Sequence, residues 1–164
     1  LSDALEHGAL LNLAQHYGYP TPLLDWTESP YVAAYFAFAG VTKNTTKGFV
    51  RIFAFNRELW METWARGPTN IDMPAPYLSV HELMPILNSR AMPQQSVVLS
   101  TNVDDIESWI ARQELPNSKY LLKIDIPVSE RSKAIRDLSW MGITAASLLP
   151  GIEGTCAALK ERYF

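Results

Sequence analysis

Cysteine is nearly missing from this sequence, and its scarcity excludes two kinds of stabilisation. Cys156 is the only cysteine, so no disulfide can form within the chain. The cysteine and the three histidines do not have the spacing of a zinc site, so we expect no structural metal. A lone cysteine is typical of a reducing compartment, and we therefore expect a cytoplasmic protein.

Long apolar runs and excess positive charge are also missing. The longest apolar stretch near the start, residues 31–40, is half of the roughly 20 residues that a membrane-spanning helix needs, so we expect no membrane partner. The chain has 14 Lys and Arg residues against 17 Asp and Glu residues, a formal net charge of −3. Non-specific binding to phosphates needs a basic surface, so the charge disfavours nucleic acid as a partner without excluding it.

The 164 residues, 48% of them hydrophobic, suit one globular domain. Residue 1 is leucine and no charged-then-apolar leader follows it. We therefore expect no signal peptide, and we expect the sequence to be a piece of a longer protein.

The hydrophobic pattern predicts helices around a few strands. Ser29 followed by Pro30 is a good helix start, and residues 19–26 read as a rigid, non-helical connection because of their two prolines. We predict helices at 3–17, 29–40, 56–66, 104–113, 129–140 and 154–162, strands at 49–55, 96–100 and 120–126, a weak helix at 80–88 and a loop at 67–76. Without regular strand–helix–strand alternation, this order predicts an α+β fold whose central, mostly antiparallel sheet is surrounded by helices.

The densest group of polar residues follows the first predicted helix. Residues 15–27 read QHYGYPTPLLDWT, and prolines on both sides of Thr21 hold the backbone still, which lowers the entropy lost on binding. A site here would use side chains from this segment, namely Gln15, His16, Tyr17, Thr21, Asp25 and Trp26. The structural alternative is that Asp25 caps the helix near Ser29 and His16 bonds a loop carbonyl.

A second polar group precedes the predicted strand at 96–100. Two amides beside a guanidinium, Gln94 and Gln95 with Arg90, can bracket the polar edge of a nucleotide. Alternatively, the amides bond neighbouring backbone and Arg90 bridges to an acidic helix. Glu153, near two glycines, is either a helix cap or a carboxylate facing the same cleft.

The remaining chemistry-bearing residues fit structural roles. We predict that His7 and His81 are surface residues and that Cys156 is a small core residue of the last helix. The tryptophans are expected to pack against other side chains, and they include Trp60, Trp64, Trp109 and Trp140.

Three segments together resemble one family. Residues 15–38, QHYGYPTPLLDWTESPYVAAYFAF, resemble the central motif of the FRG domain, which usually reads close to QHYGLPTRLLDWT before an aromatic helix. The segment SRAMPQQSVVLST resembles the family's arginine, glutamine pair and strand, and MGITAASLLPGIEGTCAALK resembles its closing segment. The resemblance spans nearly the whole chain in the right order, and we predict a single FRG-like domain over residues 1–164.

The chain departs from the family pattern at several places. Pro22 stands where members usually have arginine, Ser96 where they have glycine, and residues 149–154 where they read FPDLDG. The Phe-Arg-Gly motif that names the family does not occur in the sequence, so we expect the domain to lack that amino-terminal segment. An anion site would then depend on Arg90 or on the absent segment.

The resemblance implies a biological context for the protein more than it implies a particular reaction. FRG domains occur in bacteria and phages, and some have toxin or anti-phage roles. Their order of motifs is similar to that of ADP-ribosyltransferases, which implies a nucleotide-directed enzyme acting on NAD. The catalytic candidates are then His16, Asp25 and Gln95, and the ligand-binding candidates are Gln15, Tyr17, Thr21, Trp26, Arg90, Gln94 and Glu153.

In such an enzyme a carboxylate or an amide would stabilise the oxocarbenium charge that develops on the ribose. Glutamine is the weaker stabiliser, which argues against transferase activity. The alternative is a non-catalytic module that binds a small molecule, a nucleotide or a protein segment, and the absence of a Ser/His/Asp, Cys/His or metal motif suits it. We also predict that His16, Thr21, Asp25 and Gln95 line one pocket.

Overall fold

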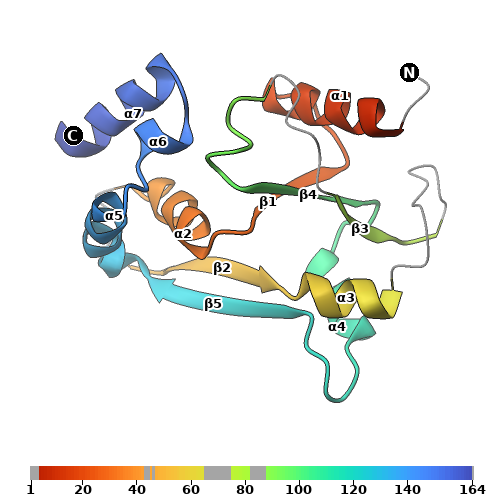
Figure 1. Cartoon of the computed structure of the whole chain (residues 1–164). Coiled ribbons are helices and arrows are strands. Elements are labelled where there is room, and N and C mark those ends of the chain that lie inside the picture. Colours follow the sequence, from red (N-terminus) through yellow and green to blue (C-terminus); the bar gives the residue numbers. More distant parts are fainter. Residues whose placement is uncertain (1–3, 43–44, 46, 65–74, 82–87, 164) are drawn as a thin grey trace. The chain divides into compact units, whose positions relative to one another are not determined.

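The computed structural model describes residues 4–42, 45, 47–64, 75–81 and 88–163, with the side chains of residues 4–7, 9 and 16 outside this description. In chain order the elements are α1 (Ala4–His16), β1 (Leu23–Thr27), α2 (Pro30–Ala39), β2 (Phe49–Phe55), α3 (Arg57–Trp64), β3 (Leu78–His81), β4 (Ser96–Thr101), α4 (Ile106–Gln113), β5 (Leu121–Pro127), the 3₁₀ turn η1 (Val128–Glu130), α5 (Arg131–Trp140), α6 (Ala145–Leu148) and α7 (Ile152–Tyr163) (Figure 1). None of the described helices has the length and apolar character that would let it cross a membrane.

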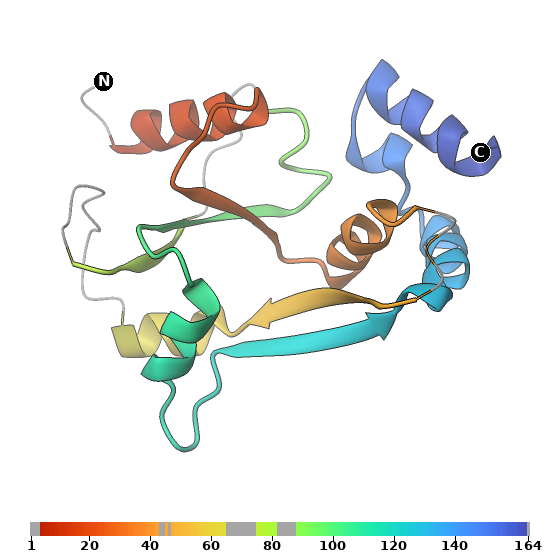
Figure 2. The same ribbon diagram turned by 180° about the vertical axis from the view of Figure 1, so that it is seen from behind.

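The described strands form two small sheets. β4 lies between β1 and β3, and β3 runs antiparallel to it with Leu78 opposite Thr101 and Val80 opposite Leu99. β2 pairs with β5, and their arrows point in opposite directions (Figures 1 and 2). The predicted α+β class is therefore confirmed, with the strands divided between two sheets.

The chain divides into two compact units. Unit 1 comprises Leu1–Asp25, Phe53–Met84 and Val97–Ile124, and unit 2 comprises Trp26–Ile52, Pro85–Ser96 and Asp125–Phe164. The prediction of a single domain over residues 1–164 stays a prediction.

Aromatic side chains form part of the core of unit 1. Trp60 is 2% exposed, and its ring centroid lies between 5.2 and 5.9 Å from those of Phe55, Trp64, Trp109 and Tyr120. Aromatic pairs at such separations add to the burial of the rings themselves. The packing predicted for three of the tryptophans is thus confirmed.

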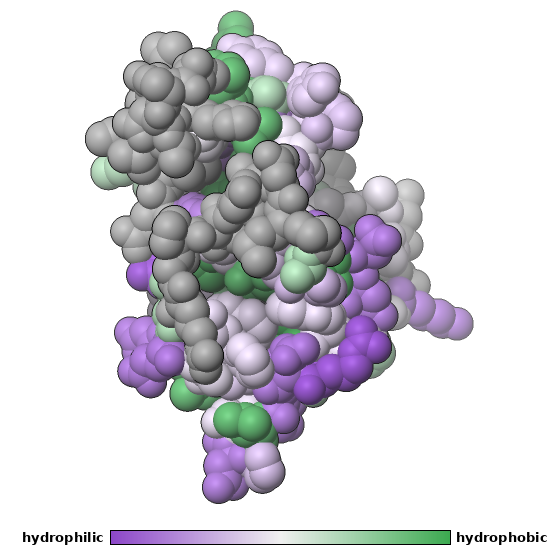
Figure 3. Space-filling model, turned by 90° about the vertical axis from the view of Figure 1, so that its right-hand side faces the viewer, coloured by the Kyte–Doolittle hydropathy of each residue, from purple (hydrophilic) through white to green (hydrophobic). Residues whose placement is uncertain are grey.

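On the face drawn in Figure 3, hydrophilic residues lie beside smaller groups of apolar ones, as on an ordinary protein surface.

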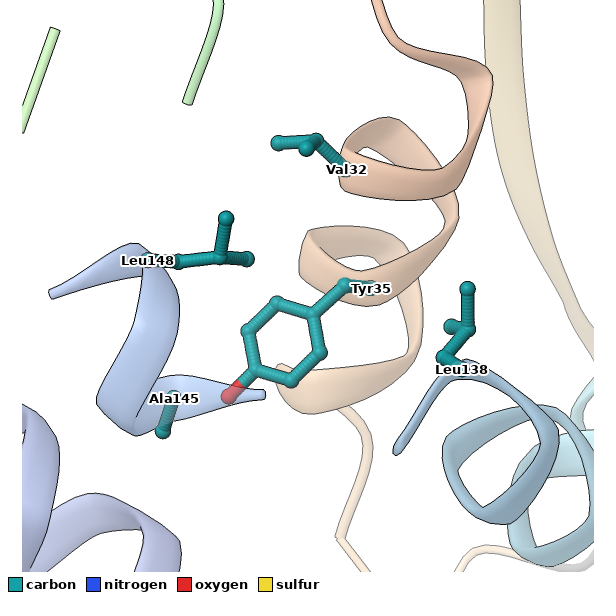
Figure 4. Close-up of a cluster of buried hydrophobic side chains, with 5 residues drawn as sticks. All are labelled: Val32, Tyr35, Leu138, Ala145 and Leu148. Atoms are coloured by element: carbon teal, nitrogen blue, oxygen red, sulfur yellow. The ribbon is translucent and has the colours of Figure 1, made fainter. Parts of the chain in front are cut away.

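Helices build the core of unit 2. Ser29 starts α2, and its Oγ accepts a hydrogen bond from the Val32 amide at 3.4 Å, as predicted from the Ser–Pro pair. Val32 and Tyr35 of α2 pack with Leu138, Ala145 and Leu148 from the carboxyl-terminal helices (Figure 4). A smaller cluster joins Phe38, Val50 and Val128.

Several predicted elements and environments are wrong. Residues 23–27 form strand β1, whereas residues 19–26 were predicted to be a rigid, non-helical connection. Residues 78–81 form strand β3, whereas a weak helix was predicted to begin at residue 80. Residues 82–87 lie outside the described chain, as does most of the predicted loop at 67–76. α6 was not predicted. Trp140 is 77% exposed, so its predicted packing is wrong. Cys156 is exposed as well, because α7 turns its small residues, not its cysteine, toward the core.

Candidate functional site

The turn at residues 88–95 lies directly before β4, and within unit 2 it is held against the start of α2. Thr27 Oγ1 donates to the Gln94 carbonyl at 2.7 Å and accepts from the Ser29 amide at 3.0 Å. The Glu28 amide donates to the Gln95 carbonyl at 3.0 Å. Two hydrogen bonds therefore link residues 27–28 to this turn, and the bond from the Ser29 amide orders Thr27 within its own segment.

The same turn is also held against the closing helices. Gln94 Nε2 donates to the Leu148 carbonyl at 3.0 Å, which satisfies one of the last carbonyls of α6. Arg90 Nη2 bonds Glu153 Oε2 in the first turn of α7 at 2.5 Å. The two side chains are 27% and 63% exposed, so this ion pair contributes little to stability. The prediction that Arg90 bridges to an acidic helix is confirmed.

Gln95 has an unusual backbone conformation. Its φ is +47°, and it is the one described residue other than glycine with a positive φ. Hydrogen bonds inside the turn impose this geometry: the Gln95 amide donates to the Met92 carbonyl and the Ser96 amide to the Ala91 carbonyl. The Gln95 side chain is exposed, so an uncommon backbone conformation presents an amide to the solvent.

The other predicted site residues are in unit 1, where α1 ends. Gly18 has φ +83°, and the amides of Gly18 and Tyr19 donate to the carbonyls of Gln15 and Ala14, which closes the helix in a Schellman motif. Thr21 Oγ1 donates to Gln15 Oε1 at 2.5 Å, so these two candidates contact each other.

The remaining candidates of this corner differ in burial. Tyr17 and Asp25 are exposed, Trp26 is half-buried at the start of unit 2, and only the backbone of His16 is described, as the last residue of α1. The prediction that Asp25 caps the following helix is wrong, because Ser29 is the cap. The predicted pocket of His16, Thr21, Asp25 and Gln95 draws on both units and stays a prediction.

Residues 2–46 match the family model of the FRG domain. This match confirms the resemblance inferred from the sequence over residues 2–46, which contain α1, β1 and α2. Comparisons with curated proteins and with solved structures found no match.

The FRG match includes Thr27 and Glu28, which donate hydrogen bonds to the turn at 88–95. It also includes Ser29, whose amide donates to Thr27 Oγ1. In unit 2 the FRG-matched segment thus holds a second segment that lies more than 40 residues beyond the match. Gln94 and Gln95 are connected to the FRG-matched segment by hydrogen bonds, not by sequence proximity.

One polar pair was missed by the sequence reasoning. His81 is half-buried on β3, and its Nε2 lies 2.8 Å from Ser100 Oγ of β4, so the prediction of a surface histidine is wrong. Burial lowers the pKa of His81 below its ordinary value of 6.5. Ser100 is only 1% exposed, so its hydroxyl is not open to a substrate. The signal that could have found His81 is the strand pattern of residues 78–81.

A cavity of about 310 Å³ in unit 1 was also not predicted. It is lined by Arg57, Glu58 and Met61 of α3 and by Val80 of β3. Residues so far apart in the chain come together only through tertiary packing, and no local motif marks them. Among the residues that the structure describes, no group of three His, Cys, Asp or Glu side chains could hold a metal ion.

Proposed function

We propose that this chain is a nucleotide-directed FRG-domain protein that contacts its ligand through the turn at residues 88–95. The observation that supports this most directly is Gln95, whose backbone has φ +47° while its amide is exposed. Non-glycine residues in this conformation carry a cost of order 1–3 kcal/mol and cluster at ligand-binding sites. The proposal includes a cytoplasmic location and a toxin or anti-phage role in a bacterium, by resemblance to the family.

The surroundings of Gln95 suit a pre-organised contact. The turn is bonded to Thr27 and Glu28 on one side and, through Gln94, to Leu148 on another. A ligand that bonds the Gln95 amide would therefore not have to order the backbone that carries it, which removes part of the entropic cost of binding. Gln94 contributes indirectly, because its side-chain amide already donates a hydrogen bond to the Leu148 carbonyl.

Arg90 would supply the contact to phosphate. A guanidinium has five donors in a planar fork, and the bond from Nη2 to Glu153 uses only part of that fork. The Glu153 carboxylate is 63% exposed and lies in the same ion pair. If the protein cleaves NAD, Glu153 is the carboxylate of this group that could stabilise the oxocarbenium charge, with Gln95 as the weaker amide.

The binding test is calorimetric titration of the full chain with NAD, ATP and ADP-ribose. Gln95→Gly should leave the protein folded and weaken binding, because glycine accepts the backbone conformation and removes the amide. Arg90→Lys should weaken binding because an ammonium cannot make the planar two-pronged contact. Arg136→Lys, on α5 of the same unit, is the matched control and should bind as the parent does.

One measurement distinguishes an enzyme from a non-catalytic binding module. Release of nicotinamide from NAD that depends on Glu153 would establish an enzyme, whereas binding without turnover would establish the non-catalytic module. Binding to none of the three nucleotides, or binding that Gln95→Gly and Arg90→Lys leave unchanged, would refute the proposed function.

A further inference from the structure

The ion pair of Arg90 and Glu153 joins two segments whose backbones are both attached to α6. On the Arg90 side, the Arg90 amide donates to Asn88 Oδ1 at 3.1 Å, and the Arg90 carbonyl accepts from the Gln94 amide at 3.1 Å. The Gln94 side chain in turn donates to the Leu148 carbonyl at the end of α6. The turn that carries Arg90 is therefore held to α6 by a bond outside the ion pair itself.

The segment that carries Glu153 is fixed to the same short helix. Glu153 lies in the first turn of α7, and α6 and α7 are neighbours (Figure 1). The next residue, Gly154, approaches α6 so closely that a Cβ there would lie 2.7 Å from the Ala145 carbonyl oxygen. Since α6 holds both the turn and α7, the ion pair opens most easily by rotation of the Arg90 and Glu153 side chains, without movement of either backbone.

The ion pair is close but weakly held. Arg90 Nη2 lies 2.5 Å from Glu153 Oε2, and the two side chains are 27% and 63% exposed. Water competes for both charges at this exposure, and such a pair contributes less than about fivefold to an equilibrium constant. The bond between them is single, whereas Arg51 bonds both oxygens of Asp125 through Nε and Nη2. Another anion can therefore replace Glu153 at little cost.

A phosphate would compete with Glu153 for this guanidinium. A two-pronged contact uses either Nε with Nη2 or Nη1 with Nη2, so both edges of the planar fork include the nitrogen that bonds Glu153. A phosphate on either edge would also lie beside the Glu153 carboxylate, and two negative charges at that separation repel each other. A diphosphate has more charge and more acceptor oxygens than one carboxylate, which makes it the stronger partner for Arg90.

We propose that Glu153 is a built-in competitor for the phosphate site of Arg90, and that a ligand with a diphosphate displaces its carboxylate from the guanidinium. This inference rests on the proposed function and adds the order of events at the site. Without such a ligand, Glu153 neutralises Arg90. Once phosphate occupies Arg90, the Glu153 carboxylate is no longer neutralised, and it then stabilises a developing positive charge more strongly. The exchange makes the site selective for ligands that carry phosphate.

The first test is an NMR titration of the full chain with inorganic pyrophosphate, which has the charge of the ligand without its base or sugar. Pyrophosphate should shift the backbone amide signals of residues 88–95. Glu153→Gln keeps the size of the side chain and removes the competing charge, so it should lower the dissociation constant by about two- to fivefold.

The matched control for this titration is Glu130→Gln. Glu130 is exposed in the same unit and lies outside the turn and α7, so this variant should bind pyrophosphate as the parent does. Equal dissociation constants for the parent and Glu153→Gln, or no shift of the turn in either protein, would overturn the proposal.

The second test follows the displaced carboxylate. The carboxyl carbon signal of Glu153, assigned by its absence from spectra of Glu153→Gln, should move toward the chemical shifts of unpaired glutamates as pyrophosphate saturates the turn. A Glu153 signal that stays in place while the turn responds would mean that phosphate and carboxylate share Arg90, and it would contradict the exchange.

The third test separates this inference from the proposed function. Glu153→Gln should raise the affinity for ADP-ribose and should not raise that for adenosine, which has no phosphate; an equal gain for adenosine would refute the competition. If Glu153→Gln tightens pyrophosphate binding while NAD, ATP and ADP-ribose do not bind, the exchange stands and the nucleotide function fails. Nucleotide binding that depends on Gln95 and Arg90 but is unchanged in Glu153→Gln would overturn the exchange and leave the proposed function in place.

Discussion

The hydroxyl of Tyr35 offers a sharp test of what holds α7 to the rest of unit 2. Tyr35 is 3% exposed on α2, and its hydroxyl donates to Glu161 Oε1 of α7 at 2.6 Å. Tyr35→Phe removes this bond and keeps the ring that packs in the cluster of Figure 4. The substitution therefore separates the hydrogen bond from the packing.

The expected loss follows from the charge and exposure of the partner. Hydrogen bonds to charged groups contribute about 1.5–3 kcal/mol. Glu161 is half-buried, so water can solvate part of its carboxylate after the change, and we expect the lower end of that range, about 1.5 kcal/mol. Tyr31→Phe, the same substitution on the same helix at a residue that is 53% exposed, should change stability by less than about 0.5 kcal/mol.

Urea denaturation of the parent and both variants measures this difference. Equal free energies of unfolding for Tyr35→Phe and Tyr31→Phe would refute the reasoning, since the two changes would then be insensitive to burial and to the bond with Glu161.

The same bond predicts a dependence on pH. Burial, then the hydrogen bond to Glu161, then the charge of Glu161 raise the pKa of Tyr35 above its ordinary value of 10.0. Above pH 10 the unfolded chain releases this proton while the folded chain keeps it, so the contribution of Tyr35 is complete below pH 10 and declines as the pH rises further. The difference in unfolding free energy between the parent and Tyr35→Phe should decline over that range, and a constant difference would contradict the assignment.

Three further substitutions test backbone features, each by urea denaturation. Gly154→Ala should cost more than about 2 kcal/mol, because the new Cβ would collide with the Leu149 carbonyl oxygen and would also lie 2.7 Å from the Ala145 carbonyl oxygen. Gly40→Ala, where the nearest such contact is 3.9 Å, should be tolerated, and similar stabilities of the two variants would contradict the close approach of α6 and α7. Ser29→Ala should cost about 1 kcal/mol through loss of the α2 cap, and Ser29→Gly only a few tenths; an unchanged Ala variant would show that the cap is dispensable. Gln95→Gly should keep the parent's stability or raise it by up to about 1 kcal/mol, and a clear loss would mean that the positive φ carries no strain.

Elements whose signals are local could be predicted from the sequence. α2 follows from Ser29 and Pro30, and β2 from the run FVRIFAF, which the structure places at the predicted residues 49–55. β1 could not be predicted, because residues 23–27 become a strand by pairing with β4, some 70 residues later. α6 is only four residues long and depends on a capping box between Thr144 and Ser147, which is too short a pattern to show periodicity.

The candidate site divides in the same way. Arg90, Gln94 and Gln95 could be selected because guanidinium and amides are close in sequence. The bond from Gln94 to the Leu148 carbonyl spans 54 residues and leaves no local trace. The positive φ of Gln95 is equally hidden, because glutamine is not a residue type that marks this conformation. The prediction that Cys156 is a core residue was wrong because both faces of α7 carry small or apolar residues, and the sequence pattern alone does not say which face is buried.

The division into two units has a consequence for how the molecule can be dissected. The chain passes from one unit to the other after residues 25, 52, 84, 96 and 124, and four of these crossings fall inside strands β1, β2, β4 and β5. Neither unit is thus a continuous stretch of polypeptide, and no single gene fragment encodes one of them. A truncation after residue 52 or 96 would remove parts of both units, and one after residue 25 or 124 would cut through a strand, so each role must be dissected by point substitution in the whole chain.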